Sequence, residues 1–161
     1  MYHTYFKKIF NGEIPPFPWA HALQNEITKA QARANVCLEC SKLHSREGWR
    51  YYQNAVQYER RSLELRERAD KEHEKLKAVW KHMARHPNGG AIYERYHRHC
   101  HELAARRELL YRLAAKVFQK REYEYEMSAR FYEFARNKDK EASEYINNME
   151  AEVAKWIATN M

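Results

Sequence analysis

The chain has 161 residues, of which 44% are hydrophobic and 32% charged, and its formal net charge is +7. This length can bury a core, and the apolar content is too high for a disordered chain. Four glycines and four prolines leave few places to turn, so a few long helices are expected rather than many short strands.

The same scarcity of glycine excludes several kinds of chemistry. The sequence has no glycine-rich phosphate loop, no dinucleotide-binding fingerprint and no Gly-x-Ser-x-Gly nucleophile motif. Most glutamates lie three or four residues from an arginine or lysine, which is typical of a solvated helix face. We therefore expect no catalytic residues and no organic cofactor, so the chain is not expected to be an enzyme.

The cysteine count and the hydropathy pattern indicate a cellular location. Three cysteines without a secretory signal peptide do not form a disulfide scaffold and favour a reducing, intracellular compartment. No apolar run approaches the roughly 20 residues that a transmembrane helix needs. We expect no transmembrane segment.

Residues 1–12 form a predicted basic amphipathic helix. At roughly 100° per residue, Tyr2, Phe6, Ile9 and Phe10 fall on one side and the two lysines on the other. Such a segment can lie on a membrane surface, dock on a partner or act as a mitochondrial targeting signal. The alternative is a terminal helix that packs on the core of its own chain.

Residues 13–18 contain three prolines and are predicted to be an extended linker, with Pro18 placed to begin a helix. Phe17 and Trp19 are candidate anchors against a neighbouring helix. The remaining residues, 19–161, are predicted to form a single helical domain.

The fold class predicted for this domain is all-α. A helix over about 19–45 is followed by Gly48, which we expect to break it. A long antiparallel hairpin follows, with helices over about 49–85 and 91–136. The segment "HPNGG" joins them, and its proline, asparagine and two glycines are the strongest turn signal of the chain. Given this turn, residues that face each other should have numbers that add up to about 177.

A last helix is predicted over about 139–159, after a break or kink near 137–143. In the first helix of the hairpin, the pattern predicts two offset buried stripes. The first half has Trp49, Tyr52, Val56 and Leu63, and the second half has Leu65, Ala69, Leu76, Val79 and Met83. In the second helix, a heptad repeat typical of a coiled coil predicts a buried line. Its members are residues 92, 96, 99, 103, 106, 110, 113, 117, 120, 124, 127, 131 and 134.

Cysteine and histidine residues allow one metal hypothesis. Cys37 and Cys40 lie three residues apart on one predicted helix, and His97 and Cys100 lie three apart on another. If these helices crossed, the four side chains could hold zinc, which prefers four such ligands in a tetrahedron. The alternatives are a Cys37–Cys40 disulfide and, the one we favour, unliganded side chains in the helix packing.

Three classes of function fit these features. The first is a non-catalytic accessory subunit of a larger assembly, bound to its other protein subunits. The long helices support it, as do aromatic residues on more than one helix face, among them Tyr51, Tyr58, Tyr123 and Tyr132. The basic charge and the amphipathic N-terminal segment resemble those of accessory subunits of mitochondrial membrane-associated, energy-transducing complexes.

The second class is association with RNA or the ribosome, because a basic protein attracts anionic partners. The third is a zinc-stabilised helical domain.

Overall fold

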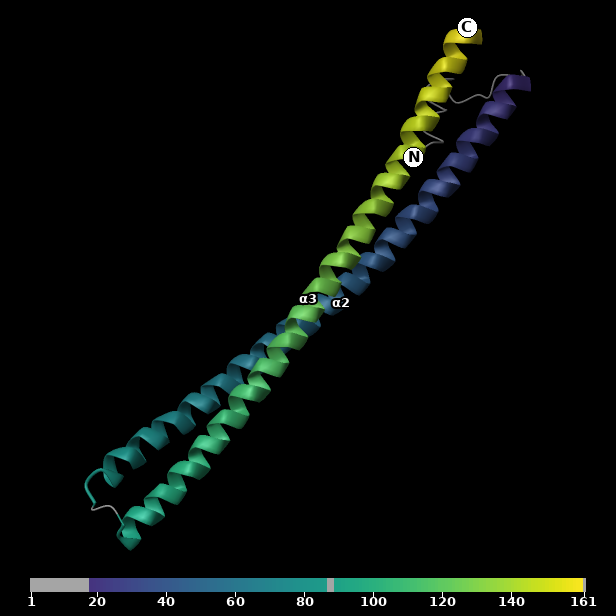
Figure 1. Ribbon diagram of the computed structural model, residues 1–161. Coiled ribbons are helices and arrows are strands. Elements are labelled where there is room, and N and C mark those ends of the chain that lie inside the picture. The colour runs from purple at the N-terminus through teal and green to yellow at the C-terminus, as the bar shows by residue number, and fades with distance from the viewer. Residues whose placement is uncertain (1–17, 87–88, 161) are drawn as a thin grey trace. The chain divides into compact units, whose positions relative to one another are not determined.

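The computed structural model describes residues 18–86 and 89–160, which form two α-helices and, over these two ranges, no strand. Helix α2 comprises Pro18–Met83 and helix α3 comprises Ala91–Asn160, and the two pack side by side in antiparallel directions (Figure 1). The predicted all-α helical hairpin is confirmed, and Pro18 is the first residue of α2. The predicted amphipathic helix over 1–12 lies outside the described residues, and so does the linker up to residue 17.

The contacts of the chain group into two compact units. Unit 1 combines the part of α2 up to Gly48 with the part of α3 from Ala129 onward, and unit 2 comprises Trp49–Ser128. Each unit is an antiparallel pair of helical segments, and each helix continues through both units. The single domain over 19–161 stays a prediction.

Gly48 does not break α2, contrary to the sequence-based prediction. A glycine inside a helix costs about 1 kcal/mol relative to alanine. Gly48 is buried, however, and a Cβ atom at its position would lie 3.1 Å from the ring of Tyr132. The missing side chain gives that ring room against the backbone of α2, and packing of this kind offsets the low helix propensity of glycine.

The break predicted near 137–143 is also absent, because α3 runs through these residues. The segment contains neither glycine nor proline. Lys138 forms an ion pair with Glu141, three residues along the helix, and Ala142 is buried against Ala34 and Cys37 of α2. Polar composition alone suggested the break, whereas ion pairs of this spacing support a helix.

The turn between the helices is where the sequence predicts it. Helix α2 ends at Met83, two residues earlier than predicted, and α3 begins at Ala91. Gly89 has a φ of 84°, a conformation that favours glycine. The first turn of α3 is closed by a bond from the backbone N–H of Glu94 to the carbonyl of Gly90.

The helices meet along a line of small side chains. In α2, every seventh residue from Ala34 to Leu76 is buried, and these define the heptad a positions of α2. They are Ala34, Ser41, Gly48, Ala55, Ser62, Ala69 and Leu76. In α3 the a positions lie at residue 100 and every seventh residue from it, and the fully buried ones are Cys100, Ala114, Ser128, Ala135, Ala142 and Met149. Small residues let two helix backbones approach closely.

The register of the pair agrees with the turn. Ser62 Oγ donates a buried hydrogen bond of 3.2 Å to the carbonyl of Ala114, and the rings of Tyr52 and Tyr125 are 5.7 Å apart. Cys37 and Ala142 pack in one cluster of unit 1. The first two pairs confirm the register predicted for the hairpin, since their residue numbers add up to about 177. The third pair shows that nearly the same register continues in unit 1, beyond the predicted hairpin.

The phase of the predicted coiled coil is half wrong. The predicted positions 96, 103, 110, 117, 124 and 131 are buried or half-buried and are the d positions of α3. The positions 92, 99, 106, 113, 120 and 134 are exposed, and the residue after each of them lies in the contact line. The prediction for α2 is wrong in the first half of its hairpin segment, where Trp49, Tyr52 and Leu63 are 53%, 41% and 55% exposed. It is right in the second half, where Leu65, Ala69 and Leu76 are buried and Val79 and Met83 are half-buried. Large apolar side chains suggested the line, whereas small ones occupy it.

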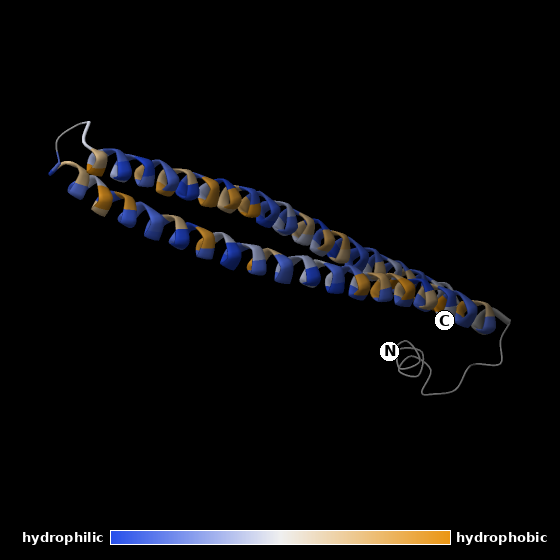
Figure 2. Ribbon diagram, turned by 90° about the horizontal axis from the view of Figure 1, so that it is seen from below, coloured by the Kyte–Doolittle hydropathy of each residue, from blue (hydrophilic) through white to orange (hydrophobic). Residues whose placement is uncertain are grey.

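Larger apolar side chains pack in clusters within each unit. In unit 1, Leu23 and Ile27 of α2 pack with Met149 and Val153 of α3. In unit 2, near the turn, Leu76 packs with Cys100 and Leu103. Apolar residues otherwise recur at intervals along both helices, separated by hydrophilic ones (Figure 2).

A larger side chain in the contact line should destabilise the protein. Ala55 is fully buried, so Ala55→Leu should lower the free energy of unfolding by about 1–3 kcal/mol through overpacking. The neighbouring Gln57→Leu, at an exposed position, is the matched control and should change it little. Urea unfolding followed by circular dichroism measures both. Equal stability of the two variants would show that the contact line lies elsewhere.

Candidate interaction surfaces

The two sides of unit 2 differ in chemistry. In an antiparallel pair, the e and b positions that flank a lie on one side of both helices, and the g and c positions that flank d lie on the other. Cross-helix contacts agree with this assignment. The ring of Tyr52 (e) contacts that of Tyr125 (e), and the guanidinium of Arg66 (e) lies 5.6 Å from the ring of Phe118 (e).

The e and b side of unit 2 carries most of its large aromatic residues, and we call it the aromatic side. Its apolar members are Trp49, Tyr52, Val56, Leu63, Trp80, Tyr111, Phe118 and Tyr125. Six of these eight are more than a third exposed, although some of them also contact the other helix at their edges. Monomeric proteins rarely expose so many large apolar groups on one side.

Hydrogen bonds between the helices hold two tyrosines of this side in place. The Tyr111 hydroxyl donates to Asp70 Oδ1 at 2.6 Å, and this bond raises the pKa of Tyr111. The Tyr125 hydroxyl donates to Glu59 at 3.4 Å, and its pKa is raised by burial and then by the charge of Glu59. Fixed rings lose little conformational freedom when a partner binds.

Arginine also packs on this side. The Arg121 guanidinium lies 4.9 Å from the centre of the Phe118 ring and 4.9 Å from that of Tyr125. Its Nη2 atom donates to Glu59 at 2.9 Å. The ring faces and carboxylates of this side therefore already hold a cation, by cation–π attraction and ion pairing.

The charges of unit 2 are unevenly divided between the two sides. Unit 2 contains 18 Lys and Arg residues and 12 Asp and Glu residues, a net +6 of the chain's +7. The e and b positions of the aromatic side carry five carboxylates against two cations, Arg66 and Lys77. The carboxylates belong to Glu59, Asp70, Glu94, Glu108 and Glu122.

The g and c positions form the opposite side, which we call the basic side. They carry nine cations against two carboxylates, those of Glu64 and Glu102. The cations are those of Arg50, Arg61, Arg68, Lys71, Lys75, Arg95, Arg106, Lys116 and Lys120. Four of these line a hollow of about 860 Å³ together with Leu109, Leu110 and three carboxylate residues, Asp70, Glu72 and Glu74. A hydrogen bond from Lys75 lowers the pKa of Glu72 in this hollow.

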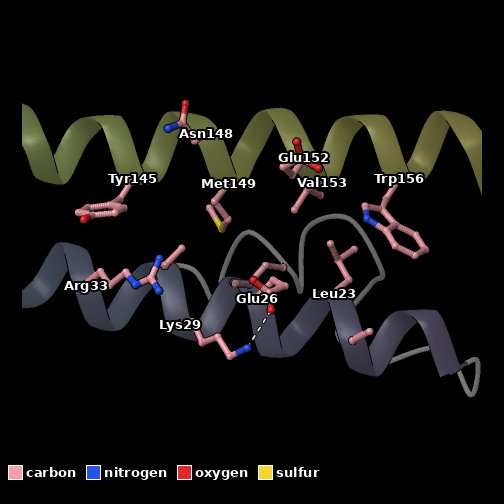
Figure 3. A pocket seen from close by; sticks show the side chains of 13 residues that line it. Leu23, Glu26, Lys29, Arg33, Tyr145, Asn148, Met149, Glu152, Val153 and Trp156 are labelled. Carbon is pink, nitrogen blue, oxygen red and sulfur yellow. Dashed lines mark hydrogen bonds and ion pairs between the residues drawn. The ribbon is translucent and has the colours of Figure 1, made fainter.

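Unit 1 has a separate apolar groove of about 470 Å³. Leu23 from α2 and Tyr145, Met149, Val153 and Trp156 from α3 point toward the space between the helices (Figure 3). Its rim is polar and includes the ion pair between Glu26 and Lys29. The groove has the size of a small-molecule site, but its charges are mixed and indicate no particular ligand.

The cysteines lie in the helix packing. Cys37 and Cys100 are buried in apolar clusters, and Cys40 is half-buried. His97 is exposed and its ring lies 4.6 Å from that of His101. Among the residues that the structure describes, no group of three or more histidine, cysteine, aspartate and glutamate side chains is placed to hold a metal ion. Nothing in the described chain supports the zinc hypothesis.

The predicted interface tyrosines have different environments. Tyr123 is 55% exposed, whereas Tyr51 and Tyr58 are half-buried at d positions of α2, and Tyr132 is half-buried against Gly48. Trp19 is part of α2. The other predicted anchors lie outside the described residues, and these are Tyr2, Phe6, Ile9, Phe10 and Phe17.

Sequence reasoning missed most residues of the aromatic side as surface candidates. Trp49 and Leu63 were expected in the core, Phe118 and Tyr111 were not singled out, and Tyr52 was considered for both the core and a partner contact. A usable signal was present in the sequence, because Ala34, Ser41, Gly48, Ala55, Ser62 and Ala69 recur at intervals of seven. That spacing predicts a close contact line and leaves larger neighbours outside it.

No helix of the described chain contains a stretch long and apolar enough to cross a membrane. No protein-family model, curated protein or solved structure matches the chain.

The cysteines should react at different rates if the packing is right. Burial raises the pKa of the Cys100 thiol, and burial followed by the charge of Glu141 raises that of Cys37. Because the thiolate is the reactive form, Cys40 should react with iodoacetamide first. Peptide mass spectrometry after timed labelling measures the order. Equal rates in the native protein, as in a urea-unfolded control, would contradict the burial of Cys37 and Cys100.

Proposed function

We propose that the chain is a non-catalytic structural subunit of a larger protein assembly and that its hairpin binds other subunits. The observation that carries the proposal is the exposure of large apolar side chains. Fifteen of them are more than a third exposed among the described residues, and ten of the fifteen lie in unit 2.

Two helices cannot bury these residues by themselves. A pair of helices has one contact line, and here small residues occupy much of it. Helices with apolar groups on further faces are normally packed between neighbours. Tryptophan and tyrosine are also the residues that contribute most to protein interfaces. Contact with other protein subunits would therefore remove these apolar groups from water, which is favourable.

The proposal extends to a mitochondrial membrane-associated, energy-transducing complex. It rests on the net charge of +7 and on the basic, amphipathic pattern of residues 1–12. That segment would anchor the chain to a partner or to the membrane surface.

RNA association is the second candidate function, and the basic side of unit 2 favours it. Nine cations against two carboxylates lie along one side of two helices. Binding to phosphates by such a surface weakens steeply with added salt, because counterions are released. Filter binding of the purified chain to a mixed-sequence RNA over a range of salt concentrations tests this function. No binding at low salt would eliminate it.

Size analysis of native cell extracts tests the subunit role. The tagged chain should migrate with a larger assembly, and stoichiometric protein partners should be found by mass spectrometry. RNase treatment of the extract is the control, because it should leave the assembly intact if proteins hold it together. A chain that migrates at the size of the isolated protein would contradict the subunit role.

Deletion of residues 1–12 tests the anchor. The shortened chain should keep its helical circular dichroism, because α2 begins only at Pro18, yet it should leave the assembly. A matched control replaces Lys7 and Lys8 by glutamine and keeps the apolar side of the segment. Co-purification of the deletion variant at full yield would show that the segment is no anchor.

A further inference from the structure

We propose that the aromatic side of unit 2 binds an amphipathic helix of a partner protein that carries Lys and Arg beside its apolar residues. This inference rests on the proposed structural role and names the surface and the partner chemistry. The partner helix would pack as a third helix against the e and b positions of α2 and α3.

The apolar groups of this side form a surface long enough for a helix. On α2 they extend from Trp49 to Leu63, roughly 21 Å at 1.5 Å per residue, and Trp80 lies farther along, beyond Asp70 and Lys77. On α3 the corresponding side chains include Tyr111 and Phe118, which contact α2 through Asp70 and Arg66. Apolar groups from both helices thus line the same side, as ridges-into-grooves packing of a third helix requires.

The charge of this side indicates a basic partner. Five carboxylates against two cations occupy its e and b positions, although unit 2 as a whole is at +6. Arg107 and Arg121 occupy a positions of α3, in the contact line next to the aromatic side. Arg121 is paired with Glu59 and Glu122, and Arg107 lies 2.8 Å from the ring of His73. Because Arg121 pairs with Glu59 and Glu122 and Arg112 pairs with Glu108, the carboxylates of this side that remain for a partner are chiefly those of Asp70 and Glu94.

Contacts within the chain show the kind of group that this side accepts. Arg66 lies over the ring of Phe118, and Arg121 lies between Phe118 and Tyr125. Trp49, Trp80 and Tyr111 offer further exposed aromatic rings. A partner's Lys or Arg can therefore find both a ring and a carboxylate, which strengthen its attraction together.

The same charges argue against two other occupants. A second copy that met this side with its own aromatic side would bring two acidic surfaces together, because a two-fold dimer uses the same surface of both copies. An anionic membrane surface would be repelled by the carboxylates too. The basic side of unit 2 is the one suited to anions.

The test uses the purified full chain and two synthetic three-heptad helices as probes. One peptide has leucine at a and d with lysine at the other positions, and the second has glutamate in place of lysine. Fluorescence anisotropy should show that the lysine peptide binds at least about tenfold tighter than the glutamate peptide. Equal affinity for the two peptides would overturn the proposed chemistry.

Two matched double variants locate the binding surface. Leu63→Gln with Phe118→Gln, at 55% and 38% exposure, should weaken the lysine peptide at least about tenfold. Leu109→Gln with Leu113→Gln on the basic side, at 57% and 40% exposure, should leave the affinity within about twofold. Circular dichroism checks that both variants stay helical. Equal losses in the two variants would overturn the assignment to the aromatic side.

A third pair of variants tests the charge. Glu94→Gln with Glu108→Gln should weaken the lysine peptide and reduce the salt dependence of its binding, whereas Glu64→Gln with Glu102→Gln on the basic side should not. Light scattering reports self-association, and a dimer that Leu63→Gln with Phe118→Gln abolishes would make a second copy the occupant and overturn the proposal. Failure of peptide binding leaves the subunit role to its own test, because the chain could still migrate with an assembly in extracts.

Discussion

The close antiparallel contact of two helices along small side chains is the constraint on which the rest of the structure depends. At its centre, Ala55 is fully buried and Ser62 bonds to the backbone of Ala114 across the interface. Gly48 accepts the ring of Tyr132 against its backbone. Such a contact gains little from hydrophobic area, since stabilisation scales with the apolar surface removed from water. Larger clusters in each unit, such as Leu76 with Cys100 and Leu103, supply more of it.

Because the contact line between the helices is narrow, much of the apolar surface beside it remains exposed. Side chains next to the small residues cannot reach the core, so Trp49 and Leu63 remain exposed although they are large and apolar. Antiparallel packing places the exposed residues on two sides, because each heptad position that flanks the contact line in α2 lies on the same side as the same position in α3. This geometry gives unit 2 one side with aromatic rings and carboxylates and another with lysines and arginines. Two chemically distinct sides would suit the proposed role as a structural subunit, because each side could contact a different partner.

The features set by backbone chemistry were predictable. The turn at "HPNGG" and the register that follows from it were predicted, because glycine, proline and asparagine restrict where a helix can end. The helix breaks at Gly48 and near 137–143 were not correct, since tertiary packing and local ion pairs outweigh the propensity of single residues. Propensity rules treat every glycine alike, and they cannot show that Tyr132 packs against this one.

The candidate surfaces were harder to predict for a related reason. Hydrophobic periodicity assumes that the largest apolar residues face the core. Here Leu63 and Leu65 are two residues apart, yet Leu63 is exposed and Leu65 is buried. Alanine, serine and glycine carry little weight in such patterns, so the buried set was assigned to the wrong face in half of its positions. The zinc hypothesis, which was not the favoured alternative, rested on residue types typical of zinc sites at helical spacing, whereas Cys37 and Cys100 pack with apolar side chains.

Hydroxyl-radical footprinting of the purified chain tests the central claim most directly. Leu63 is 55% exposed and Leu65 is 4% exposed, although both are leucines in one helix with the same intrinsic reactivity. The structure predicts rapid oxidation of Leu63 and strong protection of Leu65, with the difference lost in the urea-unfolded chain. Equal oxidation of the two leucines in the native protein, or protection of Leu63 alone, would contradict the contact line of small side chains and the aromatic side that follows from it.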